Sequence, residues 1–190
     1  RFNIGVEGQY LMGSLIAAYI GAQFSVITPL HILFIIIVAV TTSSLWAAIA
    51  GYLKVEKGIH EVISTIMLNY IGTGLIAYSL TTIFDEPNSN YDLPRTKELP
   101  ESGKMPPLNN LFNIEDLQDL HGFLVVAVFV GIFYYWLVWK TTLGFDLRIT
   151  GSNPIAARFS GINPNKLVVI AMITSGGFAG LVGFCLLYTS

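Results

Sequence analysis

The chain has 190 residues, of which 53% are hydrophobic and only 12% are charged, and its mean hydropathy is +0.64. An average soluble domain is about 25% charged, so this deficit indicates that membrane lipid is the main solvent of the chain. The net charge of -2 gives no sign of a nucleic-acid-binding protein, because no basic patch with interleaved aromatic residues accompanies it. Long apolar runs separated by clustered charges predict an all-α fold, a polytopic transmembrane helical bundle with about five membrane segments.

The first apolar run extends from about Ile4 to Phe24, which is long enough to cross a bilayer. Its first residues, FNIGVEGQ, place glycines, amides and the carboxylate of Glu7 at or near membrane depth. Broken backbone at that depth is tolerated only where it is buried in protein or lines a wet cavity. Glu7 therefore has a structural or a transport-path role, unless it is a headgroup-level carboxylate at a helix N-terminus. Small residues recur every four positions and predict close helix packing: Gly13, Ala17 and Gly21.

The second run, Leu30 to Leu53, is the clearest span and carries a similar stripe of Ser43, Ala47 and Gly51. It is followed by a short charged turn that includes Lys54 and Lys57. His31, at the other end of the run, is expected to be an interfacial residue.

The third run extends from Ile59 to about Phe84, and its polar residues follow helical offsets that place them on one face. These residues are Glu61, Ser64, Thr65, Asn69, Gly72 and Thr73. A carboxylate and an amide facing lipid would be costly, so this face should look into the bundle or into a cavity. Two interpretations stay open, a wall of a substrate path and a set of interhelical hydrogen bonds.

A polar segment rich in proline and acidic residues follows from Asp85 to about Leu120, and a solvated loop is the best interpretation of it. Within this segment the stretch from Asn113 to Leu117 could form a short amphipathic helix. The fourth run, Gly122 to Trp139, ends in a cluster of aromatic residues typical of a membrane interface.

The segment from Thr142 to Lys166 is the only polar stretch between two apolar runs that carries helix punctuation. Asn153 is a predicted N-cap and Pro154 occupies the first helical position. A helix of about two turns should end at Gly161, and Pro164 should prevent its continuation. Two interpretations are a docking element on the cytoplasmic face and an ordinary connecting loop.

The fifth run, Leu167 to Phe184, carries the small-residue pair Gly176 and Gly180. Orientation follows from the lysines and arginines in the short loops, which place the Thr142–Lys166 segment inside and the long acidic loop outside.

Both ends of the chain suggest a fragment. The chain starts at Arg1, with no initiator methionine and no signal peptide. The last six residues, CLLYTS, are what TGTCTCTTATACACATCT encodes, a common transposase adapter of sequencing libraries. We therefore predict that the native sequence stops near Phe184 and that residues 185–190 are adapter read-through. An unbroken genomic reading frame that encodes these residues would contradict this prediction. The alternative is a chance match, and Cys185, the only cysteine, supports no disulfide or metal argument.

The sequence contains no enzyme signature: no Walker A, HExxH, GxSxG or CxxC motif occurs. No catalytic residue, metal ligand or resident cofactor is expected. Energy for transport would have to come from a partner or from an ion gradient.

Three stretches together resemble the permease subunits of bacterial ABC importers. They are FNIGVEGQYLMGSLIAA, GYLKVEKGIHEVISTIMLNYI and TTLGFDLRITGSNPIAARFSGIN. The chain is most similar to the branch associated with nucleosides and basic-membrane-protein-type binding proteins, within a superfamily that includes ribose and branched-chain amino acid permeases. The resemblance covers nearly all of residues 2–184, and it implies that residues 1–184 are a partial transmembrane permease domain.

This resemblance implies a multi-pass subunit of the bacterial plasma membrane. The implied partners are cytoplasmic ABC ATPase subunits that hold ATP–Mg, a second permease subunit and an extracytoplasmic substrate-binding lipoprotein. The loop equivalent to Gly144–Gly161 would touch the ATPase, with coupling candidates Gly151, Asn153, Ala156, Ala157, Arg158 and Gly161. Candidates for the translocation path are Glu7, Glu61, Thr65 and Asn69.

The expected function is ATP-driven import of a small polar solute by alternating access, and the expected solute is a nucleoside. Sugars or branched-chain amino acids are alternative solutes. A gradient-driven carrier without an ATPase and a structural membrane subunit without transport are alternatives of other classes.

Overall fold

The computed structural model describes residues 3–25, 27–84, 96, 99–103 and 123–187, and all regular elements in these residues are helices. They are α1 (Val6–Gln23), α2 (Thr28–Lys57), α3 (Glu61–Thr82), the 3-10 helix η1 (Glu101–Gly103), α5 (Phe123–Lys140), α6 (Thr142–Ser152), α7 (Pro154–Phe159) and α8 (Pro164–Leu186). The all-α prediction is confirmed. The predicted helix from Asn113 to Leu117 lies outside the described residues.

Three helices, α2, α3 and α8, are long and apolar enough to cross a membrane. The pair α5 and α6, bent by 70° at the break between them, would add a fourth span. The helix α1 does not qualify, because its 18 residues include Glu7, Gln9 and Gln23. By length and composition the described residues therefore contain three or four spans, and the first of the five expected segments, Ile4 to Phe24, forms a helix that does not meet the same standard.

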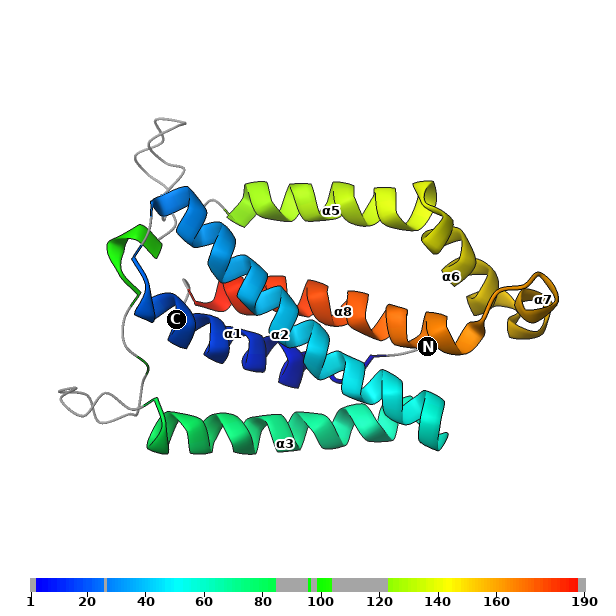
Figure 1. Cartoon of the computed structure of the whole chain (residues 1–190), viewed down its shortest axis with the longest axis horizontal. Helices are drawn as coiled ribbons and strands as arrows, with labels where there is room; N and C mark the ends of the chain where they lie inside the picture. Colours follow the sequence, from blue (N-terminus) through cyan, green and yellow to red (C-terminus); the bar gives the residue numbers. More distant parts are fainter. Residues whose placement is uncertain (1–2, 26, 85–95, 97–98, 104–122, 188–190) are drawn as a thin grey trace. The chain divides into compact units, whose positions relative to one another are not determined.

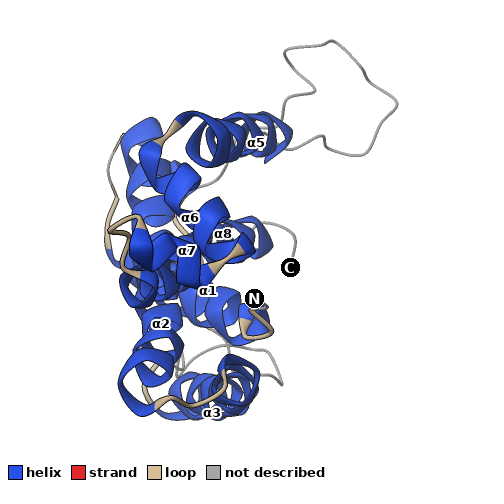
Figure 2. Ribbon diagram, turned by 90° about the vertical axis from the view of Figure 1, so that its right-hand side faces the viewer, coloured by secondary structure: helices blue, strands red, loops and turns tan. Residues whose placement is uncertain are grey.

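The chain divides into two compact units, residues 1–104 with 168–190, and residues 105–167. In the first unit α2 runs antiparallel to α1, α3 and α8 (Figure 1). The helix α1 packs on α2 and α3, and Figure 2 looks along the axes of these helices.

The predicted small-residue stripes are the contact lines of the first unit. A Cβ atom on Gly180 of α8 would lie 2.6 Å from the carbonyl oxygen of Ala39 and 2.7 Å from the Cα of Val40, both on α2. Gly176 meets Ser43 and Ala47 of α2 in the same way. Because these glycines have no side chains, the two helix backbones can approach closely, and the resulting van der Waals packing contributes to helix association in lipid.

His31, which was expected at a membrane interface, is fully buried within the protein near the start of α2. Its Nε2 lies 3.0 Å from the carbonyl oxygen of Gly21, so this nitrogen carries the proton, and its Nδ1 accepts from the hydroxyl of Ser102 at 2.9 Å. The histidine is covered because η1 folds back onto α2.

In the second unit α5 passes directly into α6 at Thr141. The Thr141 hydroxyl donates to the carbonyl of Leu137 and accepts from the amide of Gly144 at 3.1 Å, which caps α6. Gly144 lies against the carbonyls of Leu137 and Val138, where a side chain would not fit. This contact permits the bend of 70° between the two helices.

Candidate functional site

The broken start of α1 is the first candidate site, and a reciprocal amide pair organises it. The Nδ2 group of Asn3 donates to Oε1 of Gln9 at 2.9 Å, and the Nε2 group of Gln9 donates back to Oδ1 of Asn3 at 3.0 Å. Asn3 also donates to the hydroxyl of Ser175 on α8 at 2.8 Å and accepts from the amide of Gly5 at 3.1 Å. Asn3 thus uses both of its amide hydrogens and both lone pairs of its oxygen.

This pair lies near the middle of the neighbouring helices. Ser175 is the twelfth of the 23 residues of α8. Ser43, whose hydroxyl donates to the carbonyl of Gln9 at 2.7 Å, is the sixteenth of the 30 residues of α2. At 1.5 Å per residue these positions lie about 17 and about 23 Å from the starts of their helices, so α1 begins at mid-depth rather than at a membrane surface. The interpretation of FNIGVEGQ as broken backbone at membrane depth agrees with this placement.

Asn69 connects the same region to α3. Its Oδ1 accepts from the amide of Gly8 at 3.0 Å, and its Nδ2 donates to the carbonyl of Ile4 at 3.1 Å. A Cβ atom on Gly8 would lie 2.8 Å from this Oδ1 and 3.0 Å from the Cα of Asn69, so only glycine allows the two helices to come this close. The side-chain amide of Asn69 therefore forms hydrogen bonds with backbone groups at the start of α1, where the helix itself offers no partners.

The rest of the predicted polar face of α3 lies largely against the unit. Ser64, Thr65 and Gly72 are buried, Glu61 and Asn69 are half-buried, and Thr73 is exposed. The apolar residues on the other side of α3 are exposed, as expected for a lipid-facing surface: Ile63, Ile66, Met67, Tyr70 and Ile71.

The two remaining path candidates on α3 are engaged locally. Thr65 is 1% exposed, and its hydroxyl donates to the carbonyl of Glu61, one turn earlier, at 2.8 Å. The carboxylate of Glu61 pairs with the ammonium group of Lys54, with 2.8 Å between Oε2 and Nζ. This ion pair joins the end of α2 to the start of α3.

Glu7 differs from the other candidates. It is exposed, while its neighbours Gly8 and Gln9 are buried, and it has no hydrogen bond or ion pair with any described residue. An exposed carboxylate at mid-depth of a membrane protein would be costly in lipid, so the face that carries it requires water or another protein surface.

The second candidate site is the short helix α7, whose ends are set by its own sequence. The Oδ1 of Asn153 accepts from the amides of Ile155 at 3.0 Å and Ala156 at 3.1 Å, with Pro154 in the first turn. The predicted N-cap is confirmed.

The C-terminal end of α7 is a Schellman motif centred on Gly161, which has φ of +79°. The amide of Gly161 donates to the carbonyl of Arg158, and the amide of Ile162 donates to the carbonyl of Ala157, both at 3.0 Å. The predicted stop at Gly161 is confirmed. Pro164 does end the segment, but it does so as the first residue of α8, with Asn163 as a second Asn-Pro cap.

The surface of α7 carries exposed apolar side chains. Phe159 is 90% exposed and Ile155 is 69% exposed, while Ala157 is fully buried. Ala156 and Arg158 are exposed as well, as is Gly151 at the end of α6. Three of the coupling candidates, Gly151, Asn153 and Gly161, thus shape the segment or flank it, and the apolar surface comes from Ile155 and Phe159, which were not among the candidates.

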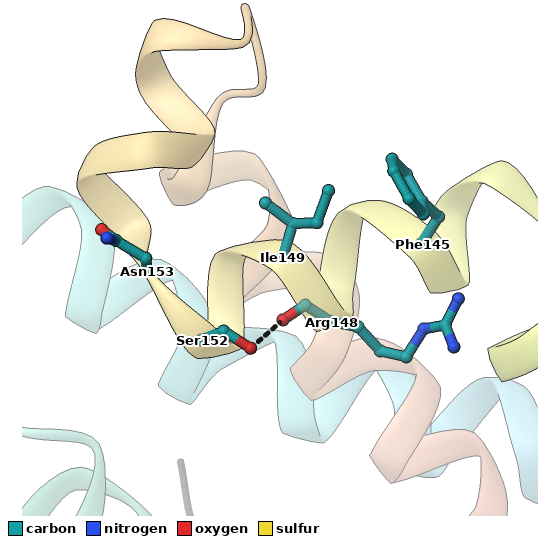
Figure 3. Close-up of a pocket in the computed structure, with 5 residues that line it drawn as sticks. All are labelled: Phe145, Arg148, Ile149, Ser152 and Asn153. Carbon is teal, nitrogen blue, oxygen red and sulfur yellow. Dashed lines mark hydrogen bonds between the residues drawn. The ribbon is translucent and has the colours of Figure 1, made fainter.

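A groove of about 310 Å³ runs along α6, the helix that precedes α7 (Figure 3). Its lining residues follow helical spacing along α6 and end at the cap of α7: Phe145, Arg148, Ile149, Ser152 and Asn153. The guanidinium carbon of Arg148 lies 4.4 Å from the centre of the Trp139 ring, which is a cation–π distance. The groove therefore combines two apolar side chains, Phe145 and Ile149, with the cation of Arg148 and the polar residues Ser152 and Asn153.

No group of three or more histidine, cysteine or acidic residues that could hold a metal ion occurs in the part of the chain that the structure describes. The structural contributors that the sequence interpretation missed are Asn3, Gln9 and Ser175. The sequence FNIGVEGQ pointed to Asn3 and Gln9 only as polar amides at or near membrane depth.

These features define a polytopic helical membrane protein with a helix that starts at mid-depth and a capped, exposed helix between two apolar segments. The whole chain, residues 1–190, matches the model of the family described as branched-chain amino acid transport system / permease component. The chain belongs to this family.

Several curated relatives are named as ABC transporter permease proteins, a class of transporter subunits and not of enzymes. The chain is 34% identical over 183 residues to the guanosine ABC transporter permease protein NupP of Bacillus subtilis, covering 96% of this chain and 51% of the relative. It is 28% identical to the nucleoside ABC transporter permease protein NupB of Lactococcus lactis, covering 96% and 50%. It is also 28% identical to the glucose ABC transporter permease protein TsgB13 of Haloferax volcanii, covering 96% and 48%.

The chain thus spans about half the length of these relatives. No solved structure matches the chain significantly.

Proposed function

We propose that the chain is part of the transmembrane permease of an ATP-driven importer in a bacterial plasma membrane, and that the transported solute is a nucleoside. The observation that carries this proposal is the match of all 190 residues to a permease family, together with relatives named for guanosine and nucleosides. Relatives named for glucose and riboflavin make sugars and other polar solutes the competing outcomes of a transport assay.

The proposed partner of α7 is a cytoplasmic ABC ATPase that holds ATP–Mg. The exposed side chains of Ile155, Arg158 and Phe159 support this role, because an isolated apolar surface on a polar connecting segment is typical of a protein interface. The groove on α6, which is lined by Phe145 and Ile149 and reaches the cap of α7 at Asn153, would receive a side chain of the ATPase. The caps at Asn153 and Gly161 fix both ends of the short helix, so that it could transmit a movement of the ATPase to the membrane helices.

The proposed path begins at the start of α1. Glu7 is the candidate contact for the solute, because its carboxylate is exposed and has no described partner. Asn69 and Thr65 would support this start from α3, and Glu61 would hold the end of α2 through Lys54. Closure of the ATPase dimer would rock these helices between outward- and inward-open arrangements, and a second permease subunit and a binding lipoprotein would complete the importer.

The docking test compares two exposed phenylalanines in the full-length permease, co-expressed with its ATPase. Phe159→Ala should reduce ATPase co-purification and nucleoside uptake at least several-fold. Phe129→Ala, on the exposed surface of α5, is the matched control and should leave both unchanged. Full retention of both properties in Phe159→Ala and in Arg158→Glu would remove α7 from the mechanism.

The solute test measures uptake of radiolabelled guanosine, glucose and leucine into cells that express the complete importer. Uptake of guanosine that requires a functional ATPase supports the proposal. Uptake that persists with an inactive ATPase and depends on the proton gradient would instead favour a gradient-driven carrier. Glucose or leucine uptake without guanosine uptake would contradict the nucleoside assignment.

A further inference from the structure

The amide pair of Asn3 and Gln9 joins α1 to α8 at a place where a helix start is hard to stabilise. The first amide groups of any helix have no intrahelical partners, and lipid offers none at mid-depth. Asn3 satisfies the amide of Gly5 and at the same time anchors to Ser175, which is 172 positions away in sequence. Because Gln9 is only 2% exposed, its amide would be costly to bury without this partner.

We infer that Asn3, Gln9 and Ser175 form the positioning element that fixes the first turn of α1, and with it the carboxylate of Glu7, on the solute path. This inference rests on the proposed function, because it assigns the network to the path of that importer. The three residues are positioning residues: they act through Glu7 and do not themselves meet the solute.

The geometry supports this role because Asn3 and Gln9 lie on either side of Glu7 in the sequence. A rotation of the first turn of α1 about its axis would therefore move Glu7 and Gln9 together. In an α-helix each residue turns the chain by about 100°, so a slip of one residue would carry Glu7 from the exposed side toward the buried side. The bond from Asn3 to Ser175 opposes such a slip, since it ties the residues before α1 to α8, and the bond from Asn3 to Gln9 connects this anchored segment to the helix. Gly5 leaves room for this arrangement, because a Cβ atom there would lie 3.0 Å from the Cβ of Thr65 and 3.1 Å from Nε2 of Gln9.

A hydrogen bond from α2 to the backbone of Gln9 provides a control. Ser43 of α2 is fully buried, and its hydroxyl donates to the carbonyl of Gln9 at 2.7 Å, so it reaches the backbone of Gln9 and makes no hydrogen bond with the side-chain amides of Asn3 and Gln9. Ser43→Ala should therefore lower stability without reorienting Glu7. Asn3→Leu and Gln9→Met keep side-chain volume and remove the pair, so they should lower stability and also displace Glu7.

The experiment uses the full-length permease with its ATPase and binding protein, in a cysteine-free background. Glu7→Cys is labelled with a membrane-impermeant methanethiosulfonate reagent, and the labelling rate reports the position of this residue independently of the solute. Asn3→Leu and Gln9→Met should each slow labelling at position 7 at least fivefold, whereas Ser43→Ala should change it less than twofold.

The same variants, with Glu7 retained, are then tested for transport. Asn3→Leu and Gln9→Met should raise KM for guanosine uptake about tenfold with a smaller change in maximal rate, and Ser43→Ala should not raise KM. Equal labelling and equal KM in the amide variants and in Ser43→Ala would overturn the inference. If the complex transports no nucleoside, the proposed function fails, and the labelling rates still decide the inference.

A milder pair of variants covers the case in which the amide variants do not reach the membrane. Ser175→Ala removes one anchor of Asn3, and Ser175→Thr keeps the hydroxyl. Slower labelling at position 7 in Ser175→Ala, with recovery in Ser175→Thr, supports the inference. Identical labelling in both overturns it.

Discussion

Asn153 stabilises α7 from outside the helix, and replacing it with alanine should open the helix more often. Its Oδ1 accepts from two amides at 3.0 and 3.1 Å, and alanine can make neither bond. The loss of an N-cap of this kind costs about 1 kcal/mol, which corresponds to roughly a fivefold change in an equilibrium constant. A helix of six residues has too few internal hydrogen bonds to compensate for this loss.

Hydrogen exchange of the backbone amides, followed by mass spectrometry on the membrane-reconstituted importer, measures this opening directly. The informative amides are those of Ala157, Ser160, Gly161 and Ile162, all of which donate within the helix or its C-terminal motif. Their exchange should accelerate about fivefold in Asn153→Ala, while Asn153→Asp keeps the acceptor and should behave like the wild type.

The chain provides a matched control in Asn163, which also precedes a proline and caps α8 through the amides of Asn165 and Lys166. Asn163→Ala should accelerate exchange in the first turn of α8 and leave α7 unchanged, because α8 continues into a packed span. The reasoning is refuted if α7 exchanges at the wild-type rate in Asn153→Ala, or if Asn163→Ala accelerates α7 equally.

Three further tests concern the packing and the polar contacts of the first unit. Gly180→Ala should lower the melting temperature of the detergent-solubilised permease, since overpacking costs about 1–3 kcal/mol, whereas Gly74→Ala, where a Cβ atom meets nothing within 4 Å, should not. Asn69→Leu should lower the same melting temperature more than Asn69→Asp, because the aspartate still accepts from the amide at the start of α1 while leucine leaves both backbone groups unpaired. In a double-mutant cycle Lys54→Met and Glu61→Gln should show a coupling of about 1 kcal/mol or less that weakens with salt; a coupling near zero at low salt would show that the ion pair does not hold the two helices.

The sequence predicts those features whose causes are local. The boundaries of α7 follow from residues within one short stretch, because Asn153, Pro154 and Gly161 each act on the backbone next to them. The small-residue stripes also follow from spacing along single helices. Their partners do not, since the contact of Gly180 with α2 depends on how two helices 140 positions apart align.

The features that the sequence did not predict depend on structure elsewhere. The sequence indicates α6 only as part of a polar segment, since Gly144 and Gly151 lower its helix propensity. In the structure the Thr141 cap and the close contact of Gly144 with α5 stabilise the start of this helix. His31 was expected at an interface because it lies at the end of an apolar run. It is buried because η1, which lies 70 positions later, covers it and supplies the hydroxyl of Ser102.

The start of α1 shows most clearly where local patterns stop being sufficient. Asn3, Glu7 and Gln9 are all polar residues at membrane depth, and the sequence alone gives the carboxylate the greatest weight because burying a charge costs most. In the structure the two amides satisfy each other, and Asn3 reaches Ser175 at 2.8 Å, so the neutral residues hold the helix start while the carboxylate remains exposed. Amides suit this task because each carries both donors and an acceptor, so a single pair can close on itself and still bind a third residue. A carboxylate offers only acceptors. In this network it could accept from the amide hydrogens of Gln9 but could not donate to any partner, which explains why the charged residue, Glu7, lies outside the network.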